Sequence, residues 1–552
     1  MNQMGWSVLG GLVGTLFGAI LLPVEGSELF ESDRSPPPVG QLDRMVFARL
    51  EQAGIEPVLC SDAVFLRRAY LDVIGTLPTA DEARRFLADT AADKRTRLIE
   101  HLLQRPEFPD YWSMKWGDVL RIKAEIPVNL WPNAAQAYHR WVRAALAQNQ
   151  PYDRFVRELL TSSGSNFQVG PVNFYRAIQD KTPEGIAATV ALTFMGARAD
   201  AWPEDRVAGM AVFFSQIGYK PTSEWKEEIV YWDPLAAAER GVLGRVEPGT
   251  VERGSRDGAL TVAVMRGLDR PLRAVFPDGT PLDLPPSRDP REAFADWLIT
   301  PENPWFTRSI VNRVWAWFLG RGLVHEPDDL RQDNPPCYPE LLEYLEQELI
   351  AADYDLQHLY RLILNSRTYQ LSSLPHPGMR DDQVPFARYV PRRLDAEVLI
   401  DAINQITGTT DLYTSPIPEP FTFIPREMRA IALADGSITS QFLALFGRSA
   451  RATGLANERS NQPVPAQWLH LLNSSHIQQK LASGPWLPQL LEGEGSRDEM
   501  IETVYLTILS RPPTREEVRS VSRYVQSVPG RRAAAIDLAW ALINTQEFLY
   551  RH

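Results

Sequence analysis

Residues 65–82 read FLRRAYLDVIGTLPTADE and contain the pattern that decides the fold. Apolar side chains recur at four-residue steps from Phe65 to Val73, so one side of this segment is apolar, as in an amphipathic helix. The Pro-Thr step that follows ends this helix and starts another, because Thr79 suits the N-cap position and Glu82 completes a capping box. The stretch therefore predicts two consecutive α-helices joined by a tight turn.

The same order of features returns near the end of the chain. Residues 505–517 read YLTILSRPPTREE and align with residues 70–82. Downstream of each copy, a Glu-Phe step follows, at residues 107–108 and 547–548. Chance similarity of capping residues is the plainer explanation, but three features in matched order favour one helical module used twice.

Helical patterns dominate most of the remaining chain. Residues 41–219 are predicted to form an N-terminal helical domain. Residues 291–552 are predicted to form a C-terminal one, which opens with a long amphipathic helix over 291–318. Between them, residues 220–290 place Gly, Pro and charged residues around short β-prone runs such as 260–264. The predicted fold class is therefore mainly α, a multi-helical body with a small β insert.

The N-terminal segment is the strongest targeting signal. Residues 6–24 contain no charged side chain and suit the apolar region of a signal peptide. We therefore predict that residues 1–26 are a signal peptide or an uncleaved N-terminal anchor, and that the protein is exported to the periplasm or cell surface. Residues 27–40 are polar and proline-rich and are predicted to be a linker. Membrane contact is expected only through an uncleaved anchor.

Composition and missing motifs exclude several classes of protein. The 552-residue chain has a net charge of −12 and a pI near 5.4, which argues against a nucleic-acid partner. The two cysteines, Cys60 and Cys337, cannot form a disulfide framework or a zinc site, and whether they pair with each other stays open. The sequence has no phosphate-binding glycine loop, serine-hydrolase elbow or zinc-protease helix motif. We therefore expect no cofactor.

Several segments in order resemble the paired domains of unknown function 1549 and 1553, found together in exported proteins of planctomycete-type bacteria. The first domain is matched by FLRRAYLDVIGTLPT at residues 65–79. The second is matched by REAFADWL at 291–298, FLGRGLV at 318–324, RRLDAE at 392–397 and LHLLN at 469–473. The resemblance runs from about residue 41 to the C-terminus.

This cytochrome-associated family implies no established reaction for the chain. Many relatives carry a CxxCH haem-attachment motif shortly before a helix that ends in Phe-Phe. The corresponding residues here, 194–214, contain neither Cys nor His. Covalent haem needs two thiols and an axial ligand, so electron transfer is the least expected function.

One group of polar residues that could carry chemistry is HEPDDLRQDNPP at residues 325–336. Asp328, Asp329 and Asp333 could bind a hard cation such as Ca²⁺, although the metal hypothesis is weak because the spacing is not that of an EF-hand. The same carboxylates could instead act as general acid and base. A surface loop held by caps and salt bridges is the plainer interpretation.

A second polar group lies more than a hundred residues further along. Its arginines could bind carboxylate, sulfate or phosphate in a bidentate manner, and its single carboxylate and its amides could add hydrogen bonds. The predicted anion- or partner-binding residues are Arg448, Arg451, Asn457, Glu458, Arg459 and Asn473. His470 lies among them as a further candidate catalytic residue. An internal ion-pair network that joins helices is the competing interpretation.

These observations leave two functions open. The favoured hypothesis is an exported binding or assembly component that engages a partner protein or an anionic polysaccharide through the second group. The alternative is an extracytoplasmic hydrolase that cleaves complex polysaccharide with carboxylates of the first group. Both groups should then lie around one shared hollow.

Overall fold

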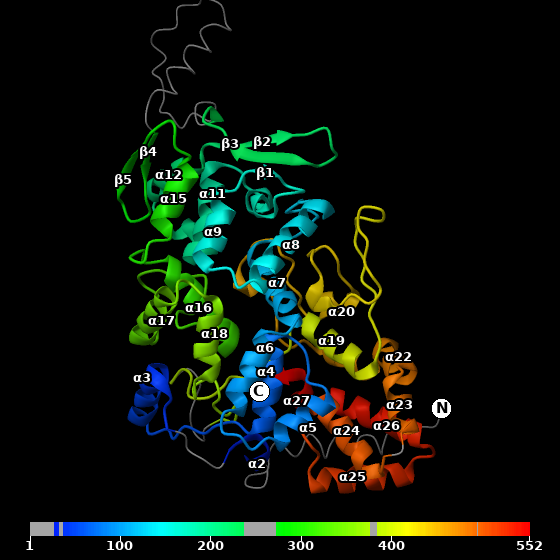
Figure 1. Cartoon of the computed structure of the whole chain (residues 1–552). Helices are drawn as coiled ribbons and strands as arrows, with labels where there is room; N and C mark the ends of the chain where they lie inside the picture. Colours follow the sequence, from blue (N-terminus) through cyan, green and yellow to red (C-terminus); the bar gives the residue numbers. More distant parts are fainter. Residues whose placement is uncertain (1–26, 33–36, 237–271, 376–383, 494) are drawn as a thin grey trace, which may run out of the picture.

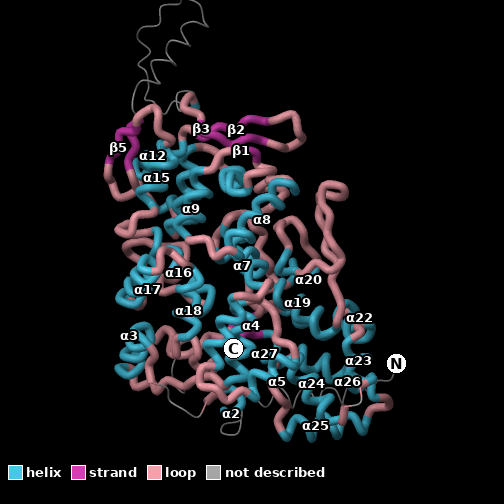
Figure 2. The backbone as a smooth tube through the Cα atoms, in the orientation of Figure 1, coloured by secondary structure: helices cyan, strands magenta, loops and turns pink. Residues whose placement is uncertain are grey.

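The computed structural model describes residues 27–32, 37–236, 272–375, 384–493 and 495–552. Helices make up most of this part of the chain, so the predicted mainly α fold is confirmed. In Figure 1 the N-terminal helices lie against the C-terminal ones at one end of the molecule, whereas two of the small sheets lie at the opposite end. Figure 2 shows the strands of these two sheets in magenta at that end, beside helices α12 and α15.

The first half of the chain is built from short and medium-length helices. They are α2 (Ser27–Phe30), α3 (Gly40–Gln52), α4 (Asp62–Val73), α5 (Ala80–Ala88), α6 (Lys94–Leu103), α7 (Glu107–Val119), α8 (Pro132–Ala147), α9 (Tyr152–Thr161), α10 (Asn173–Ala177), α11 (Pro183–Val190) and α12 (Glu204–Ala211). A π-helical turn over Ala191–Met195 continues α11.

The second half is also mainly helical in its described residues. Its helices are α15 (Pro290–Leu298), α16 (Phe306–Leu319), α17 (Pro339–Ala351), α18 (Leu356–Asn365), α19 (Ala396–Thr407), α20 (Gln441–Leu445), α21 (Pro465–Asn473), α22 (Ser475–Ser483), α23 (Trp486–Glu492), α24 (Arg497–Leu509), α25 (Arg515–Ser527), α26 (Arg531–Ile543) and α27 (Gln546–Leu549).

The single long helix predicted over residues 291–318 is wrong. Two helices, α15 and α16, occupy this range, and a turn separates them. The turn contains Pro301 and Pro304, and proline cannot donate the backbone hydrogen bond that a continuing helix needs. The side chain of Asn303 accepts hydrogen bonds from the backbone N–H groups of Trp305 and Phe306, which caps the second helix.

Strands are few and form three small sheets. β1 (Gly164–Ser165), β3 (Glu228–Trp232) and β2 (Ile217–Pro221) form one antiparallel sheet in that order. β4 (Leu272–Val275) and β5 (Pro281–Leu284) form a hairpin. The predicted β insert therefore contains strands as expected. Its first sheet also includes β1, which lies in the predicted N-terminal domain. The predicted strand at 260–264 lies outside the described residues.

The third sheet joins distant parts of the chain and was not predicted. β6 (Arg392–Arg393) pairs antiparallel with β7 (Tyr550–Arg551), so the C-terminal strand is fixed beside the start of α19. In this register Arg393 lies opposite Tyr550, and Arg392 lies opposite Arg551.

Both copies of the predicted helical module have the expected capping boxes. The side chain of Thr79 accepts a hydrogen bond from the backbone N–H of Glu82, and the carboxylate of Glu82 accepts one from the backbone N–H of Thr79. Thr514 and Glu517 form the same reciprocal pair. Each box removes two unpaired donors from a helix start, which explains why the turn chemistry located these helices from sequence.

The two modules also share an internal salt bridge. Arg105 joins the capping glutamate of the first copy to Glu107 of its Glu-Phe step, with both N–O distances at 2.8 Å. In the second copy Arg511 joins the capping glutamate to Glu547 at 2.8 and 2.6 Å. The first helix of the second copy, α24, packs against α5 of the first.

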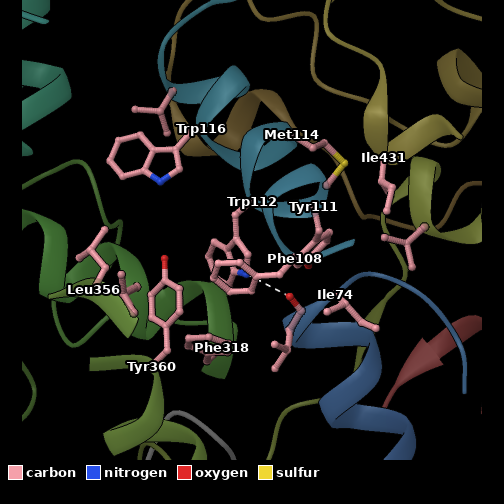
Figure 3. Close-up of a cluster of buried hydrophobic side chains, with 14 of the residues drawn as sticks. Ile74, Phe108, Tyr111, Trp112, Met114, Trp116, Phe318, Leu356, Tyr360 and Ile431 are labelled. Carbon is pink, nitrogen blue, oxygen red and sulfur yellow. Dashed lines mark hydrogen bonds between the residues drawn. The ribbon is translucent and has the colours of Figure 1, made fainter. Parts of the chain in front are cut away.

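Aromatic side chains fill the centre of the core between α7, α16 and α18. The ring of Trp112 stacks on Tyr360 at 4.5 Å, and its indole N–H donates to the carbonyl of Val73 (Figure 3). Trp317 contacts both Trp112 and Trp116, at centroid distances of 5.5 and 5.8 Å. This packing fixes the positions of α7 and α16, whose C-terminal ends form part of the site described below.

The cysteine pairing that the sequence left open and the predicted N-terminal segment remain. Cys60 and Cys337 are both free thiols, so they do not pair. The predicted signal peptide or anchor at residues 1–26 lies outside the described residues. Within the part of the chain that the structure describes, no helix is long and apolar enough to cross a bilayer.

Candidate functional site

A pocket of about 570 Å³ lies where segments from both halves of the chain meet. Its walls come from the C-terminal ends of α7 and α16, the segment 320–327, the β6–β7 pair and the loop 454–463. Exposed residues at its edge, among them His325 and Pro463, show that it opens to the surface. Its volume is within the range of small-molecule sites in proteins.

Basic side chains outnumber acidic ones in this pocket. The basic residues are Lys115, Arg313, Arg321, Arg392, Arg393, Arg459 and Arg551. The acidic residues are Asp118, Glu326 and Asp395. Since the whole chain carries a net charge of −12, this excess of positive charge is a local feature. A concave surface lined by one sign of charge attracts ligands of the opposite sign.

Asp395 contacts positively charged side chains from two different parts of the chain. Lys115 contacts one of its carboxylate oxygens at 2.7 Å, and Arg551 contacts the same oxygen at 2.6 Å. Asn461 donates to the other oxygen at 3.0 Å. Burial alone would raise the pKa of Asp395, but the positive charges around it hold the pKa well below its ordinary value. Asp395 is therefore held in its charged form in the pocket lining.

Two further carboxylates, Asp118 and Glu397, are bridged by Arg459, which contacts them at 2.8 and 2.6 Å. Arg451 is the second partner of Asp118, and Arg448 is the second partner of Glu397. Burial opposes ionisation of Glu397, but these arginines lower its pKa to about 2. Arg448 and Arg451 are buried within this network and do not line the pocket. Both were predicted to bind an anion or partner; the structure places them outside the pocket, with their charges paired internally.

Three pocket arginines have no carboxylate partner among the described residues. Arg313 donates to two backbone carbonyls, at 2.8 and 3.3 Å, and its burial lowers its pKa. Arg393 donates to two other carbonyls, at 2.7 and 3.1 Å, and burial lowers its pKa as well. Arg321 has a buried Nε without a hydrogen-bond partner. A buried charge without a counter-charge is costly, and an anionic ligand would relieve that cost.

Aromatic and amide groups complete the lining. Trp317 and Tyr550 present half-buried rings, and Asn457 and Asn461 present amides. The side-chain oxygen of Asn461 is buried and has no partner in the described part of the chain. Rings and amides beside guanidinium groups suit a ligand with an apolar ring face, hydroxyl groups and a negative charge.

The aspartates of the 325–336 loop serve mainly to hold the loop. Asp328 is buried, accepts a hydrogen bond from the backbone N–H of Ala456 at 3.0 Å and pairs with Arg198 at 3.3 Å. Asp329 and Asp333 both pair with Arg331, at 3.1 and 3.4 Å. None of the three lines the pocket. As candidate catalytic residues they are therefore poorly placed.

A metal site in this loop is not supported either. Among the described residues, no group of three or more His, Cys, Asp or Glu side chains is arranged to hold a metal ion. The two polar groups singled out from sequence nevertheless meet, because Asp328 contacts the backbone of the 454–463 loop and His325 lines the pocket with Asn457 and Arg459.

The other predicted site residues are divided between the pocket and its surroundings. Asn457 and Arg459 line the pocket. Glu458 accepts hydrogen bonds from the backbone of Ala452 and Thr453 and so shapes the loop. His470 packs against Phe442 and Phe446 outside the pocket, and Asn473 is exposed at the end of α21. His470 and Asn473 therefore do not belong to the site.

Sequence reasoning missed the residues that face the pocket from other elements. Lys115 and Tyr550 were not among the predicted site residues, and Arg321 was noted only as part of the segment 318–324 that carried the family resemblance. Arg393 did lie in a segment that carried the family resemblance. In that segment two adjacent arginines, Arg392 and Arg393, precede two acidic residues, and this pattern could have marked them as site residues. The pairing of β6 with β7 is a tertiary feature that no local pattern indicates.

The segment that corresponds to the haem motif of relatives does not fit a haem in this chain. Residues 194–214 supply neither thiol nor imidazole. Arg198 of this segment is instead paired with the buried Asp328.

Comparison with protein families gives two matches. Residues 41–202 match the family described as "Protein of unknown function (DUF1549)", and residues 290–525 match "Protein of unknown function (DUF1553)". No curated protein and no solved structure matches the chain. The two matched regions begin at the starts of the predicted N-terminal domain, residue 41, and C-terminal domain, residue 291, within one residue. The chain therefore belongs to the proteins that carry these two domains of unknown function in tandem.

Proposed function

We propose that this protein binds an anionic ligand, a charged segment of a polysaccharide, in the 570 Å³ pocket. The observation that carries the proposal is the set of three pocket arginines, Arg313, Arg321 and Arg393, that lack a carboxylate partner among the described residues. Guanidinium groups bind carboxylate and sulfate through paired, charge-assisted hydrogen bonds.

The surrounding ion pairs support this assignment. The carboxylates of Asp118 and Asp395, which line the pocket, already form ion pairs with other lysine and arginine side chains. These carboxylates therefore do not neutralise the three arginines, whose charges are available for a ligand. Because the protein as a whole is acidic, non-specific attraction of polyanions to its surface is weak, and binding depends on this local site.

A carbohydrate fits the pocket better than a bare inorganic ion. The ring of Trp317 is held by the aromatic core behind it, and its exposed part faces the pocket. Rigid aromatic faces contact the apolar faces of sugar rings, while amides such as those of Asn457 and Asn461 bind hydroxyl groups. The pocket opens to the surface, so a chain can enter and leave it.

The hydrolase alternative is less well supported. Glycoside hydrolysis commonly uses two carboxyl groups that flank the scissile bond. In this pocket Asp118 and Asp395 are locked in ion pairs, which leaves Glu326 at the edge. Electron transfer ranks last, since residues 194–214 do not provide haem ligands.

The proposal can be tested by binding assays with polygalacturonate, heparin and uncharged dextran. We expect the two anionic polymers to bind and dextran not to bind. R321Q removes a charge that has no ion pair with any described residue, so it should weaken binding about 10- to 100-fold, as expected for one charge-assisted hydrogen bond of about 1.5–3 kcal/mol. R331Q is the matched control, because Arg331 lies outside the pocket and pairs with Asp329. Equal weakening by both variants would contradict the assignment.

We also propose that the protein is exported, on the strength of the uncharged segment at residues 6–24. N-terminal sequencing of the protein recovered from expressing cells tests this. A start near residue 26 in an extracytoplasmic fraction supports export by a cleaved signal. Recovery of the intact chain from the cytoplasm contradicts export.

A further inference from the structure

We propose that the pocket cleaves its ligand by β-elimination at a uronate unit, with Tyr550 as the proton-transfer group. This inference rests on the proposed binding of an anionic polysaccharide and adds a reaction to it. Elimination breaks the bond between C4 of a uronate and the oxygen of the neighbouring sugar. It needs a base near C5 and cationic groups at the uronate carboxylate, and it needs no pair of free carboxylates.

The sheet register places the two required groups side by side. Tyr550 and Arg393 are directly opposite each other in the antiparallel β6–β7 pair. Opposite residues of an antiparallel pair point to the same face, with their Cβ atoms about 4.5–5.5 Å apart. Both side chains line the pocket. In the proposed reaction the phenol oxygen of Tyr550 is the base, and the guanidinium of Arg393 beside it supplies positive charge.

The same pair is held rigidly. The guanidinium of Arg393 is fixed by two backbone carbonyls, at 2.7 and 3.1 Å, and by the side chain of Gln467. The backbone of Tyr550 is fixed by its pairing with β6. Preorganised charges of this kind stabilise the negative charge that develops on a substrate during proton removal.

The charge distribution favours elimination over hydrolysis. When the proton at C5 leaves, negative charge moves onto the uronate carboxylate, where Arg313, Arg321 and Arg393 can neutralise it. Hydrolysis would instead need a protonated acid and a free carboxylate. The bases around Asp395 hold its pKa well below its ordinary value, so it cannot be that acid.

The proposed step balances without any co-reactant. The phenolate oxygen of Tyr550 takes the proton from C5 of the uronate. The electron pair of that C–H bond forms a double bond between C4 and C5 while the bond from C4 to the bridging oxygen breaks. The phenol of Tyr550 then returns the proton to that oxygen, which becomes the new reducing end of the leaving sugar. The other product is a 4,5-unsaturated uronate.

The test is incubation of the full-length protein with polygalacturonate, alginate and chondroitin, followed by ultraviolet absorbance and mass spectrometry of the products. We expect unsaturated oligosaccharides from at least one of these polymers. Y550F keeps the aromatic ring and removes only the hydroxyl group, so it should bind the polymer as the wild type does and lose about 100-fold or more in kcat. Y344F is the matched control, because Tyr344 lies on α17 outside the pocket, and it should retain full activity.

The outcomes separate this inference from the proposed function. Binding of these polymers without unsaturated product overturns elimination and leaves the binding function intact. Products that contain the elements of water also overturn it, because they indicate hydrolysis. Unsaturated product at an unchanged rate in Y550F overturns the role of Tyr550. If the protein neither binds nor cleaves any of the polymers, the proposed function fails as well.

Discussion

Replacement of Arg551 by methionine should destabilise the protein strongly although this residue is the second from the end of the chain. Its guanidinium is buried and joins two carboxylates, Asp72 at 2.9 Å and Asp395 at 2.6 Å. Removal of one partner from a buried ion pair typically costs about 3–5 kcal/mol, because the remaining charge is left uncompensated. Methionine keeps the apolar volume, so the variant isolates the loss of charge.

The structure places this variant at the lower end of that range. Asp72 keeps hydrogen bonds from the hydroxyl groups of Tyr369 and Tyr389, at 3.0 and 2.9 Å. Asp395 keeps its contact with Lys115. We therefore expect R551M to lower the free energy of unfolding by about 3 kcal/mol.

Urea unfolding, followed by circular dichroism, measures this change. The control is R531M, because Arg531 is exposed on α26, and its loss should change stability by less than about 0.5 kcal/mol. The double variant R551M/D395N also removes the charge of one of the two carboxylates that Arg551 pairs with, and it should recover part of the loss. A loss below about 1 kcal/mol in R551M would refute the view that these buried charges depend on each other.

Two further predictions concern acid stability and backbone space. Glu397 has a folded-state pKa of about 2, below its ordinary value, so its stabilising contribution is present above pH about 4.5 and is lost as the pH falls towards 2. Burial lowers the pKa of His139 to about 3 and that of His552 to about 4. Below pH about 6.5 the unfolded chain therefore binds protons at these histidines more readily than the folded protein does, and the free energy of unfolding falls. The buried Asp401 acts in the opposite direction, because burial raises its pKa to about 6, but its shift is smaller than the two histidine shifts together. Urea midpoints should therefore fall on acidification, and a midpoint that rises between neutral pH and pH about 4.5 contradicts this reasoning. G447A should destabilise the protein at the pocket loop. Gly447 has a φ of +81°, and an added Cβ would lie 1.9 Å from the backbone oxygen of Ser460 in that loop. A thermal stability equal to that of the wild type would contradict this prediction and show that the loop adapts.

Local chemistry made the helical modules predictable. A capping box depends on residues three positions apart, so Thr79 with Glu82 and Thr514 with Glu517 could be found in the sequence. The break between α15 and α16 could also have been predicted, because Pro301 and Pro304 were visible. The amphipathic pattern continued across them and concealed it.

The site was less predictable for a physical reason. Whether an arginine is free for a ligand depends on which carboxylate lies beside it, and that is decided by tertiary packing. Arg448 and Arg459 look alike in sequence, yet Arg448 is enclosed by internal partners whereas Arg459 reaches the pocket. Tyr550 gains its position from a strand pairing across more than 150 residues of chain.

The affinity of the wild-type protein for an oligogalacturonate, compared with its fully methyl-esterified form, tests the central claim most directly. The two ligands share their rings and linkages and differ in carboxylate charge. The arginine-lined pocket predicts clear calorimetric binding of the charged form, weaker as salt rises, and little binding of the ester. Equal affinity for both forms, or no binding of the charged one, would contradict the claim.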